Sequence, residues 1–229
     1  MFDVHVVRSR SNTSYAAQLD DMFRQRYDVF IRRLKWDIPG VDHRLGREMD
    51  QFDGPDTVYL LVMDGSAVLG ASRMVPTTGP NLMRDVFPTL CTAGPPDSGD
   101  VWEWSRGHVK PDEPPPVRSK VLDHIFVSGY EFALSSGIGA LTAQINAAEF
   151  PRWLKRGLVV GLLGPPVRFQ DGSEIVALQH LITPATLEQV RVETAIHHSV
   201  LTYPAVLTWP ETSSAGRPAE PRRGQRWQR

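Results

Sequence analysis

The sequence predicts a single α/β domain with a mixed sheet. Two observations indicate this fold class: hairpin-linked apolar runs dominate the middle of the chain, and strand-like and helix-like segments alternate in its second half. The 229 residues, with 41% hydrophobic and 22% charged side chains, have ordinary globular composition and suffice for one large core. We expect residues 1–209 to form this domain. Residues 210–229, where five arginines stand against two glutamates, predict a disordered basic tail.

The N-terminal quarter is predicted as a strand, a helix and a long loop. The β-branched run at residues 4–7 predicts an edge or opening strand. Residues 37–57 contain several glycines and prolines and little periodicity, so we expect a long loop, and such loops in compact domains are often functional. Between them, apolar side chains recur at spacings of three and four, as in an amphipathic helix: Leu19, Met22, Phe23, Tyr27 and Phe30.

The rest of the chain continues this pattern. Two apolar runs, residues 58–63 and 67–75, flank Asp64-Gly65, which is a strong hairpin signal. The later elements are predicted in the following order: a short helix within residues 81–90, a loop over 92–100, a strand over 101–109, a helix with its apolar face from Val121 to Ala133, a strand over 140–145, a short helix over 148–156, strands over 158–163 and 174–182 around the Asp171-Gly172 turn, and a helix capped by Thr183 and Pro184 that runs to about His198.

Charge and cysteine content argue against several classes of protein. The 25 basic and 26 acidic side chains give a formal net charge of -1, which argues against a nucleic-acid binder. The single cysteine, Cys91, leaves no disulfide framework or cysteine-built zinc site within one chain. The N-terminus lacks a signal-peptide pattern, and the longest apolar stretch is far short of the ~20 residues that span a bilayer. We expect a cytoplasmic protein with no membrane insertion.

The long loop carries the first candidate site. Glu48, Asp50 and Asp53 lie within six residues of one another in a segment that also contains glycine. Carboxylates at this density can bind a cation or an amine. The alternative is a solvated acidic loop without a ligand, and the spacing does not give the ligand order of an EF-hand calcium loop.

The strand over residues 101–109 carries the second candidate site. Period two places Glu103 and Ser105 on one face and Trp104 and Arg106 on the other, unless a bulge changes this assignment. A carboxylate between two indoles can be partly desolvated, which raises its pKa and suits a general base. The alternative is an ion pair of Glu103 at the end of the strand.

Other motifs indicate structure rather than chemistry. Gly137-Ile138-Gly139 lacks the third glycine of a dinucleotide fingerprint and is interpreted as a helix stop. His197 and His198 are adjacent, and adjacent residues on a helix point apart, so we expect no metal there or elsewhere. The sequence has no HExxH, GxSxG or GxxxxGK[ST] pattern, which lowers the weight of those reaction classes.

Taken in chain order, these residues resemble the acyl-homoserine-lactone synthases, the autoinducer synthases of bacterial quorum sensing. The resemblance is dense over residues 20–110, weak over 111–209 and absent from the tail. No single element is specific, but the ordered set is: Arg26-x-x-x-Phe30, Trp36, Glu48-x-Asp50-x-x-Asp53, Tyr59-Leu60-Leu61, Arg73, Pro80-Asn81, Phe87-Pro88 and Glu103-x-Ser105-Arg106.

The resemblance implies a fold and a reaction. The fold is similar to that of the Gcn5-related N-acetyltransferases, a twisted mixed sheet flanked by helices. Such enzymes take S-adenosylmethionine and an acyl thioester as substrates, without a further cofactor. The amino group attacks the thioester carbonyl and forms an amide, and the carboxylate oxygen then displaces methylthioadenosine and closes the lactone ring. The acyl donor is usually acyl carrier protein, and in one branch it is coenzyme A.

That chemistry suggests roles for the matching residues. Glu103 is the candidate acceptor of the amine proton, because an α-amino group is mostly protonated at neutral pH. Backbone N–H groups near residues 104–106 are candidate donors to the oxyanion. Asp50 and Asp53 are candidate partners of the sulfonium and the amine. Arg26 is the candidate partner of the substrate carboxylate, which it can bind bidentately.

The remaining family residues have supporting roles in this interpretation. Phe30 and Trp36 are expected to close over adenosylmethionine, with Glu48 and Phe87 in support. Ser105 and Arg106 complete the catalytic set with Glu103. Arg73 and Arg106 either bind substrate or hold the carboxylates of the loop, since an ion-pair network and a binding site would use the same residues.

The acyl donor stays open between carrier protein and coenzyme A. Gly107-His108 follows the Ser-Arg pair where the family often has an aromatic residue, which is expected to reshape the acyl pocket. Thr77-Thr78 and Trp102-Glu103-Trp104 are closer to the branch with coenzyme A users. The donor contact is expected at Arg152, Lys155 and Arg156, although Pro151 and Trp153 are unusual there. Apolarity suggests four pocket walls, with core packing as the alternative: Leu122, Phe126, Leu141 and Ala143.

Two other functions remain as alternatives. The first is an N-acyltransferase of the same fold that acts on another amine. The Arg/Gln-x-x-Gly-x-Gly/Ala loop that is common in that superfamily is missing, which argues against it. The second is a non-catalytic sensor that binds adenosylmethionine. The carboxylate and arginine set argues against a sensor, and the sequence has no DNA-reading helix pair.

Overall fold

The computed structural model describes residues 2–155, 158–169 and 172–203, and the tail predicted at residues 210–229 lies outside them. Within these residues, nine strands form one sheet in the order β6-β8-β5-β4-β3-β2-β1-β9, with β7 on β8. The pairs β4–β5 and β1–β9 are parallel and the other pairs are antiparallel, so the mixed sheet is confirmed. The strands are β1 Asp3–Arg8, β2 Val58–Asp64, β3 Ala67–Pro76, β4 Val101–Val109, β5 Ala140–Asn146, β6 Val160–Leu162, β7 Val167–Arg168, β8 Glu174–Leu181 and β9 Leu201–Thr202.

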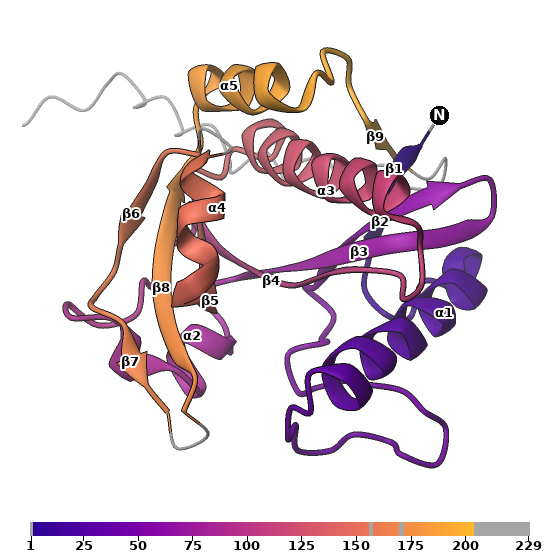
Figure 1. Ribbon diagram of the computed structural model, residues 1–229, viewed down its shortest axis with the longest axis horizontal. Coiled ribbons are helices and arrows are strands. Elements are labelled where there is room, and N and C mark those ends of the chain that lie inside the picture. Colours follow the sequence, from indigo (N-terminus) through magenta and orange to yellow (C-terminus); the bar gives the residue numbers. More distant parts are fainter. Residues whose placement is uncertain (1, 156–157, 170–171, 204–229) are drawn as a thin grey trace, which may run out of the picture.

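Helices cover both faces of the sheet (Figure 1). The long α3 and the outer α5 lie over one face, and α1 lies against the other. No helix of the described ranges is long and apolar enough to cross a membrane. The helices are α1 Ala16–Arg26, which continues as a π-helical segment over Tyr27–Arg33, α2 Leu82–Asp85, α3 Pro115–Ser135, α4 Phe150–Lys155 and α5 Pro184–Thr194.

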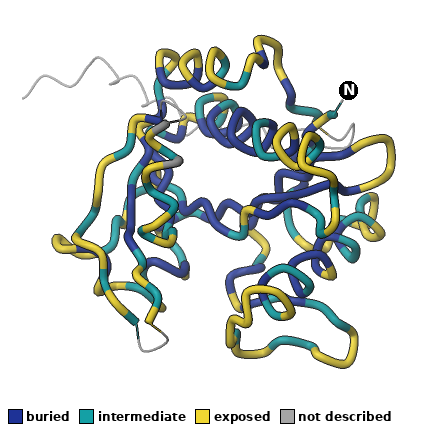
Figure 2. The backbone as a smooth tube through the Cα atoms, in the orientation of Figure 1, coloured by how far each residue is buried: buried dark blue, intermediate teal, exposed yellow. Residues whose placement is uncertain are grey.

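The sheet separates two apolar cores. The larger core lies between α3, α5 and the sheet, where α3 contributes the buried Val121, Ile125 and Phe132. The smaller core packs the predicted stripe of α1, including Met22 and Phe23, against β1, β2 and β3. Figure 2 shows the buried backbone concentrated in α3 and the central strands, with exposed positions on the outer helices and loops.

Local signals explain most helix ends. The Asn81 side chain caps α2, and Thr183 with Thr186 forms a capping box at α5, as the Thr183-Pro184 signal predicts. The α5 helix ends at Thr194 with Ala195 in the left-handed conformation, four residues before the predicted end. The two-residue strands β7 and β9 were not predicted, because periodicity carries no signal over two residues.

Strands β4 and β5 run side by side only over a short stretch and then diverge (Figure 1). Their parallel pairing joins Val101–Glu103 to Ala140–Thr142. Beyond Glu103, the edge of β4 that faces β5 has no strand partner among the described residues. Backbone groups of β4 are therefore left open to another molecule directly after Glu103.

A bulge in β4 changes the direction of Arg106. Between the pairs Arg73–Ser105 and Ala71–His108, β4 has two residues where β3 has one. Arg106 adopts a φ of 54°, the left-handed conformation that a side chain normally disfavours. Its side chain reaches the same carboxylate, Asp50, as Arg73 does. The bulge therefore overrides the period-two pattern, which places Arg106 and Ser105 on different faces of the strand.

The packing of Trp104 on α3 predicts the effect of Gly129→Ala. A Cβ at Gly129 would lie 2.7 Å from Trp104 Cζ2, so the indole of Trp104 would have to move within a packed core. Alanine favours the helix by about 1 kcal/mol, but overpacking costs about 1–3 kcal/mol, and we expect a net loss of stability. Urea unfolding measures it. Gly79→Ala is the control, because nothing lies within 4 Å of its Cβ, and it should change stability by less than about 0.5 kcal/mol. A stabilised Gly129→Ala would contradict this packing.

Candidate active site

Six buried charged side chains meet where α1, the loop over residues 37–57 and strands β3 and β4 converge. Three are cations and three are anions, so the cluster is balanced. We call this set the buried ion network. Five of its members are at most 8% exposed as whole residues. The sixth, Arg106, is partly exposed as a residue, but its side chain is only 7% exposed. It consists of Arg26, Arg73, Arg106, Glu48, Asp50 and Asp53.

Arg26 lies at the centre of this network with every guanidinium nitrogen occupied. Its Nε donates to Glu48 Oε2 at 2.5 Å, and its Nη1 and Nη2 donate to the two oxygens of Asp53 at 2.9 and 3.0 Å. The residue is 0% exposed. Burial alone would raise the pKa of the Asp53 carboxyl, but the charges of Arg26 and Arg73 outweigh it and hold this pKa well below its usual range. Contact of Arg26 with a substrate carboxylate would therefore require these bonds to break.

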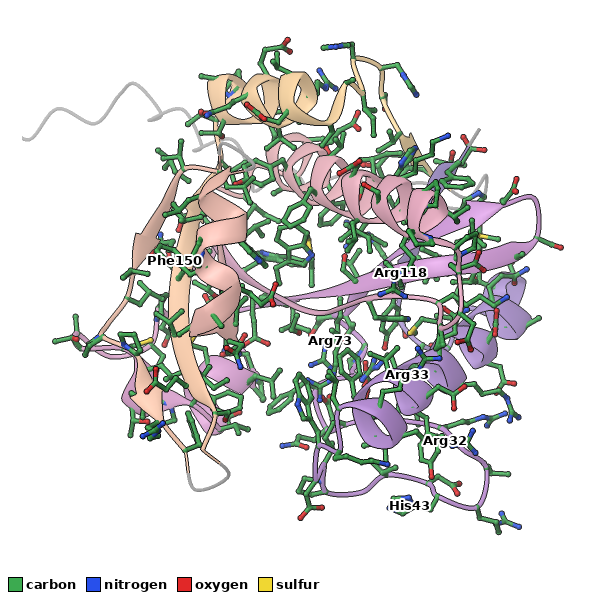
Figure 3. The ribbon with its side chains drawn as sticks, viewed as in Figure 1. Arg32, Arg33, His43, Arg73, Arg118 and Phe150 are labelled. Carbon is green, nitrogen blue, oxygen red and sulfur yellow. The ribbon has the colours of Figure 1, made fainter. Side chains whose placement is uncertain are left out.

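Arg73 differs from Arg26 because one of its nitrogens is free. Its Nε donates to Ser105 Oγ at 3.2 Å, and its Nη1 donates to Asp50 Oδ1 at 2.5 Å. The Nη2 atom is buried and has no hydrogen-bond partner in the part of the chain that the structure describes. Figure 3 shows Arg73 in the middle of the molecule. A fully buried guanidinium with an unused donor is the feature expected of a residue that binds an anion.

The acidic loop is ordered by its own side chains. The Asp50 N–H donates to Asp53 Oδ2 and the Phe52 N–H donates to Asp50 Oδ1, each at 2.9 Å. Tyr59 on β2 donates its hydroxyl hydrogen to Asp53 Oδ1 at 2.9 Å. Glu48 is 0% exposed. The alternative of a solvated acidic loop is therefore wrong, and the loop is a built part of the site.

Glu103 is a buried carboxylate with one free oxygen. Its Oε2 accepts hydrogen bonds from the Met83 N–H at 2.7 Å and from Gln144 Nε2 at 3.0 Å. Its Oε1 has no partner within the described ranges, and it forms no ion pair there. Burial raises the pKa of Glu103, although the Met83 N–H and the charge of Arg73 oppose this effect. The alternative of an ion pair at the strand end is therefore wrong.

Aromatic rings lie beside the ion network. Phe30 stacks on Trp36 with ring centroids 4.9 Å apart, and the Arg106 guanidinium carbon lies 5.5 Å from the centroid of Phe30. Phe30 is buried, whereas Trp36 is 46% exposed and forms the outer layer of this stack. Phe87 lies elsewhere, against Phe169 in the small cluster at α2.

The predicted acyl residues belong to the larger core or to β5. Phe126 and Leu141 are buried in the larger core, Leu122 packs against it, and Ala143 is buried on β5. Arg152 and Lys155 belong to α4, but their side chains are not among those described, and Arg156 lies outside the described residues.

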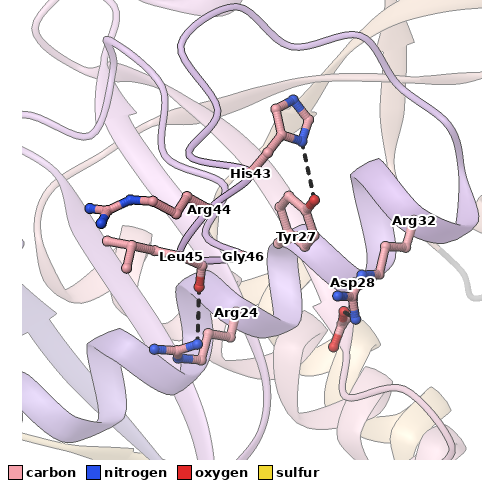
Figure 4. A pocket seen from close by; sticks show the side chains of 8 residues that line it. All are labelled: Arg24, Tyr27, Asp28, Arg32, His43, Arg44, Leu45 and Gly46. Atoms are coloured by element: carbon pink, nitrogen blue, oxygen red, sulfur yellow. Dashed lines mark hydrogen bonds and ion pairs between the residues drawn. The ribbon is translucent and has the colours of Figure 1, made fainter.

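A surface cavity of about 230 Å³ lies apart from this site, between α1 and the loop (Figure 4). Two of its basic side chains already have partners: Arg24 donates to Leu45 O, and Arg32 pairs with Asp28. None of its lining residues belongs to the predicted site. The lining residues are Arg24, Tyr27, Asp28, Arg32, His43, Arg44, Leu45 and Gly46.

Sequence reasoning assigned no role to two residues that complete the site. Gln144 on β5 donates to Glu103, and Tyr59 donates to Asp53. Tyr59 belongs to the ordered set, which is a signal for its importance. Gln144 carries no such signal, because only the pairing of β4 with β5 brings it near Glu103.

Comparison with known proteins decides the family. The model of the family described as "Autoinducer synthase" matches residues 10–190. The chain belongs to the autoinducer synthase family. The isovaleryl-homoserine lactone synthase of Bradyrhizobium diazoefficiens is 34% identical over 176 residues, which are 76% of this chain and 78% of the relative. The acyl-homoserine-lactone synthase of Pseudomonas aeruginosa is 33% identical over 163 residues, 71% of this chain and 79% of the relative.

Solved structures agree with this family. The CoA-dependent acyl-homoserine lactone synthase BjaI, with SAM and isopentyl-CoA, is 30% identical, covers 89% of this chain and 94% of its own, and has a TM-score of 0.80. The CoA-dependent synthase MesI is 31% identical, with 87% and 98% coverage and a TM-score of 0.78. The N-acyl amino acid synthase FeeM, at 12% identity and a TM-score of 0.53, is similar in fold alone. The autoinducer synthase is an acyltransferase with the expected fold.

The ion network predicts a strong effect of Asp53→Asn on stability. The variant leaves Arg26 and Arg73 with uncompensated buried charge, so we expect a loss of about 3–5 kcal/mol in the free energy of unfolding, measured with urea at neutral pH. The exposed pair Arg32–Asp28 provides the control: Asp28→Asn should cost less than about 1 kcal/mol. Equal losses in the two variants would contradict a buried network.

The same network predicts how stability depends on pH. The folded-state pKa of Asp53 lies below its ordinary value of 3.8. Its ionised form therefore stabilises the fold fully above that value, and this contribution is lost as the pH falls below about 4. The free energy of unfolding should therefore differ less between pH 6 and pH 3.5 in Asp53→Asn than in the unchanged protein.

Proposed function

We propose that this synthase makes an acyl-homoserine lactone from S-adenosylmethionine and an acyl thioester of coenzyme A. The observation that carries the proposal is Glu103, a buried carboxylate with a free oxygen where β4 and β5 diverge. The names of BjaI and MesI, two CoA-dependent synthases of similar structure, support coenzyme A as the donor. Acyl carrier protein is the competing donor, and the assay below separates the two.

Glu103 accepts the proton of the α-amino group in the first step. Its Oε1 is free for this hydrogen bond, while Oε2 is held by Met83 and Gln144. The amine nitrogen then attacks the thioester carbonyl, and the C–S bond breaks. The nitrogen gives its second proton to the leaving sulfur, so coenzyme A leaves as the thiol, and Glu103 releases the first proton to solvent. Because the pKa of the Glu103 carboxyl is raised, it lies closer to the pKa of the amine, which favours proton transfer between them. Backbone N–H groups near residues 104–106, on the unpaired edge of β4, are the candidate donors to the oxyanion.

Arg73 binds the carboxylate of adenosylmethionine through Nη2. Val75 pairs with Glu103 and Arg73 with Ser105, so Arg73 and Glu103 are diagonal neighbours on adjacent strands. The free donor of Arg73 and the free oxygen of Glu103 thus suit the two ends of one α-amino acid. Arg26, with all its nitrogens occupied, is a positioning residue for the acidic loop.

The remaining residues hold the substrate. Ser105 Oγ accepts from Arg73 and positions its guanidinium. Asp50 is the most exposed carboxylate of the network, at 8%, and is the candidate partner of the amine or sulfonium. Phe30 and Trp36 cover adenosylmethionine, with Trp36 as the part that moves. In the second step, the carboxylate oxygen attacks the γ-carbon, the C–S bond breaks, and methylthioadenosine leaves.

The function is tested with purified full-length protein, adenosylmethionine and a panel of acyl groups on coenzyme A and on carrier protein. We expect a lactone product by mass spectrometry, with methylthioadenosine release that requires both substrates and is fastest with a coenzyme A donor. Preference for carrier protein would overturn the donor assignment. An acylated amine other than adenosylmethionine, or binding without turnover, would overturn the function.

Glu103→Gln tests the base. The amide keeps the shape of the side chain but cannot accept the proton, so kcat/KM should fall by roughly 10²–10⁴-fold. The acid limb of the pH–rate profile that Glu103 causes should disappear as well. The exposed Glu188→Gln on α5 is the matched control and should retain activity and its pH profile. An unchanged acid limb in Glu103→Gln would exclude Glu103 as the base.

Arg73→Gln tests the carboxylate contact. The KM for adenosylmethionine should rise by at least about tenfold, because the pairing of guanidinium and carboxylate is lost. Inhibition by decarboxylated adenosylmethionine, which lacks that carboxylate, should change much less. The exposed Arg32→Gln serves as the control. If the KM for adenosylmethionine and the inhibition constant of decarboxylated adenosylmethionine rose equally in Arg73→Gln, Arg73 would act on structure and not on the carboxylate.

A further inference from the structure

Five rings form a cluster on the α3 face of the sheet, beside the divergence of β4 and β5. The His180 ring centroid lies 5.1 Å from that of Trp153, 5.7 Å from that of Trp104 and 5.8 Å from that of Tyr130. Phe126 completes the set, 5.7 Å from Trp104 and 5.3 Å from Trp153. We call these five residues the aromatic cluster. His180 is its unusual member, because an aliphatic side chain would satisfy an apolar core.

One nitrogen of His180 is left without a partner. The residue is 0% exposed, and its Nδ1 lies 2.8 Å from the Tyr130 hydroxyl. Its Nε2 is buried and makes no hydrogen bond to any described residue. Burial lowers the pKa of His180 to about 3, so the ring is neutral at physiological pH and carries one N–H.

The hydrogen-bond pattern indicates which nitrogen carries that hydrogen. The Tyr130 hydroxyl has His180 as its sole hydrogen-bond partner within the described ranges. If Nδ1 donated to Tyr130, the buried phenol hydrogen would have no acceptor. If Tyr130 donates to Nδ1, the phenol is satisfied and the hydrogen of the ring lies on Nε2. The second arrangement leaves a single N–H donor inside an apolar cluster.

This donor lies close to the proposed reaction. Trp104 follows Glu103 directly in β4, on the opposite face, at the point where β4 leaves β5. His180 on β8 pairs with Leu141, which is next to the last paired residue of β5. Trp153 on α4 is the least buried ring of the five, since it is partly exposed and the other four are buried. If the carbonyl of a thioester lies near Glu103, the acyl chain can therefore extend between the diverging strands to the aromatic cluster.

We propose that the aromatic cluster receives the acyl group of the donor and that His180 Nε2 donates a hydrogen bond to an oxygen carried by that acyl group. The inference rests on the proposed function and specifies its substrate class as an oxo-, hydroxy- or alkoxy-substituted acyl thioester. Trp153 moves aside as the acyl group enters. An acyl group that lacks the oxygen leaves the buried N–H of His180 unpaired, so its kcat/KM is lower than that of the oxygenated acyl group.

Pairs of acyl-CoA donors that differ by one oxygen test this inference. The pairs are unsubstituted, 3-oxo and 3-hydroxy acyl chains of equal length, and aryl acyl groups with and without a ring hydroxyl or methoxy group. For at least one pair, the oxygenated donor should have a kcat/KM at least about tenfold higher. His180→Phe should bring this ratio near one by lowering kcat/KM for the oxygenated donor, and Tyr130→Phe should reduce it. Phe126→Leu is the control: it alters shape without a polar group, so both donors should change together.

The outcomes separate this inference from the proposed function. Lactone formation with ratios near one for every pair, or a ratio that His180→Phe leaves unchanged, overturns the inference alone. No lactone from any donor overturns the proposed function. A second measurement does not depend on turnover: ¹⁵N–¹H correlation spectra of the imidazole should show the hydrogen on Nε2, shifted when an oxygenated acyl-CoA is added. A hydrogen on Nδ1, or no shift with any donor, would instead indicate that His180 and Trp153 form only a structural contact.

Discussion

The buried ion network is the interaction on which the rest of the site depends. Charges are expensive to bury, and they are stable inside a protein only when partners and hydrogen bonds compensate them. Here three guanidinium groups meet three carboxylates. The partners come from α1, from the acidic loop and from two adjacent strands, so no element can move without exposing a charge. The loop contributes no helix and no long strand, and its conformation follows from carboxylates that accept from its own backbone.

The network also explains the unusual backbone of β4. A left-handed conformation at Arg106 costs about 1–3 kcal/mol, and it persists because the bulge brings the guanidinium to Glu48 and Asp50. Three residues earlier, the strand is regular and holds Glu103 at the last position paired with β5. The irregular half of β4 therefore completes the ion network, whereas the regular half places Glu103, the proposed base, at the edge of the divergence.

The local signals of the sequence predicted much of the fold, and the resemblance to the synthase family named the candidate residues of the site. The hairpin at Asp64-Gly65, the cap at Thr183 and the stripe of α1 depend on neighbours in the chain, so they could be predicted. The charge partners could not. Whether Arg26 or Arg73 has a free nitrogen depends on contacts 22 to 32 residues away. The direction of Arg106 depends on a bulge, and His180 gains its meaning from a tyrosine 50 residues distant.

The two free atoms at the proposed site are linked electrostatically. The charge of Arg73 lowers the pKa of Glu103 and opposes the effect of burial. A substrate carboxylate bound to Nη2 would weaken the effect of that charge on Glu103, because the potentials of two paired opposite charges largely cancel at a third group. The opposition to burial would weaken, and the pKa of Glu103 would rise toward that of the amine. In the proposed reaction, the same contact that orients adenosylmethionine therefore makes Glu103 a stronger base. A carboxylate buried without such a neighbour would already be protonated, and it could not accept the proton when the substrate arrives.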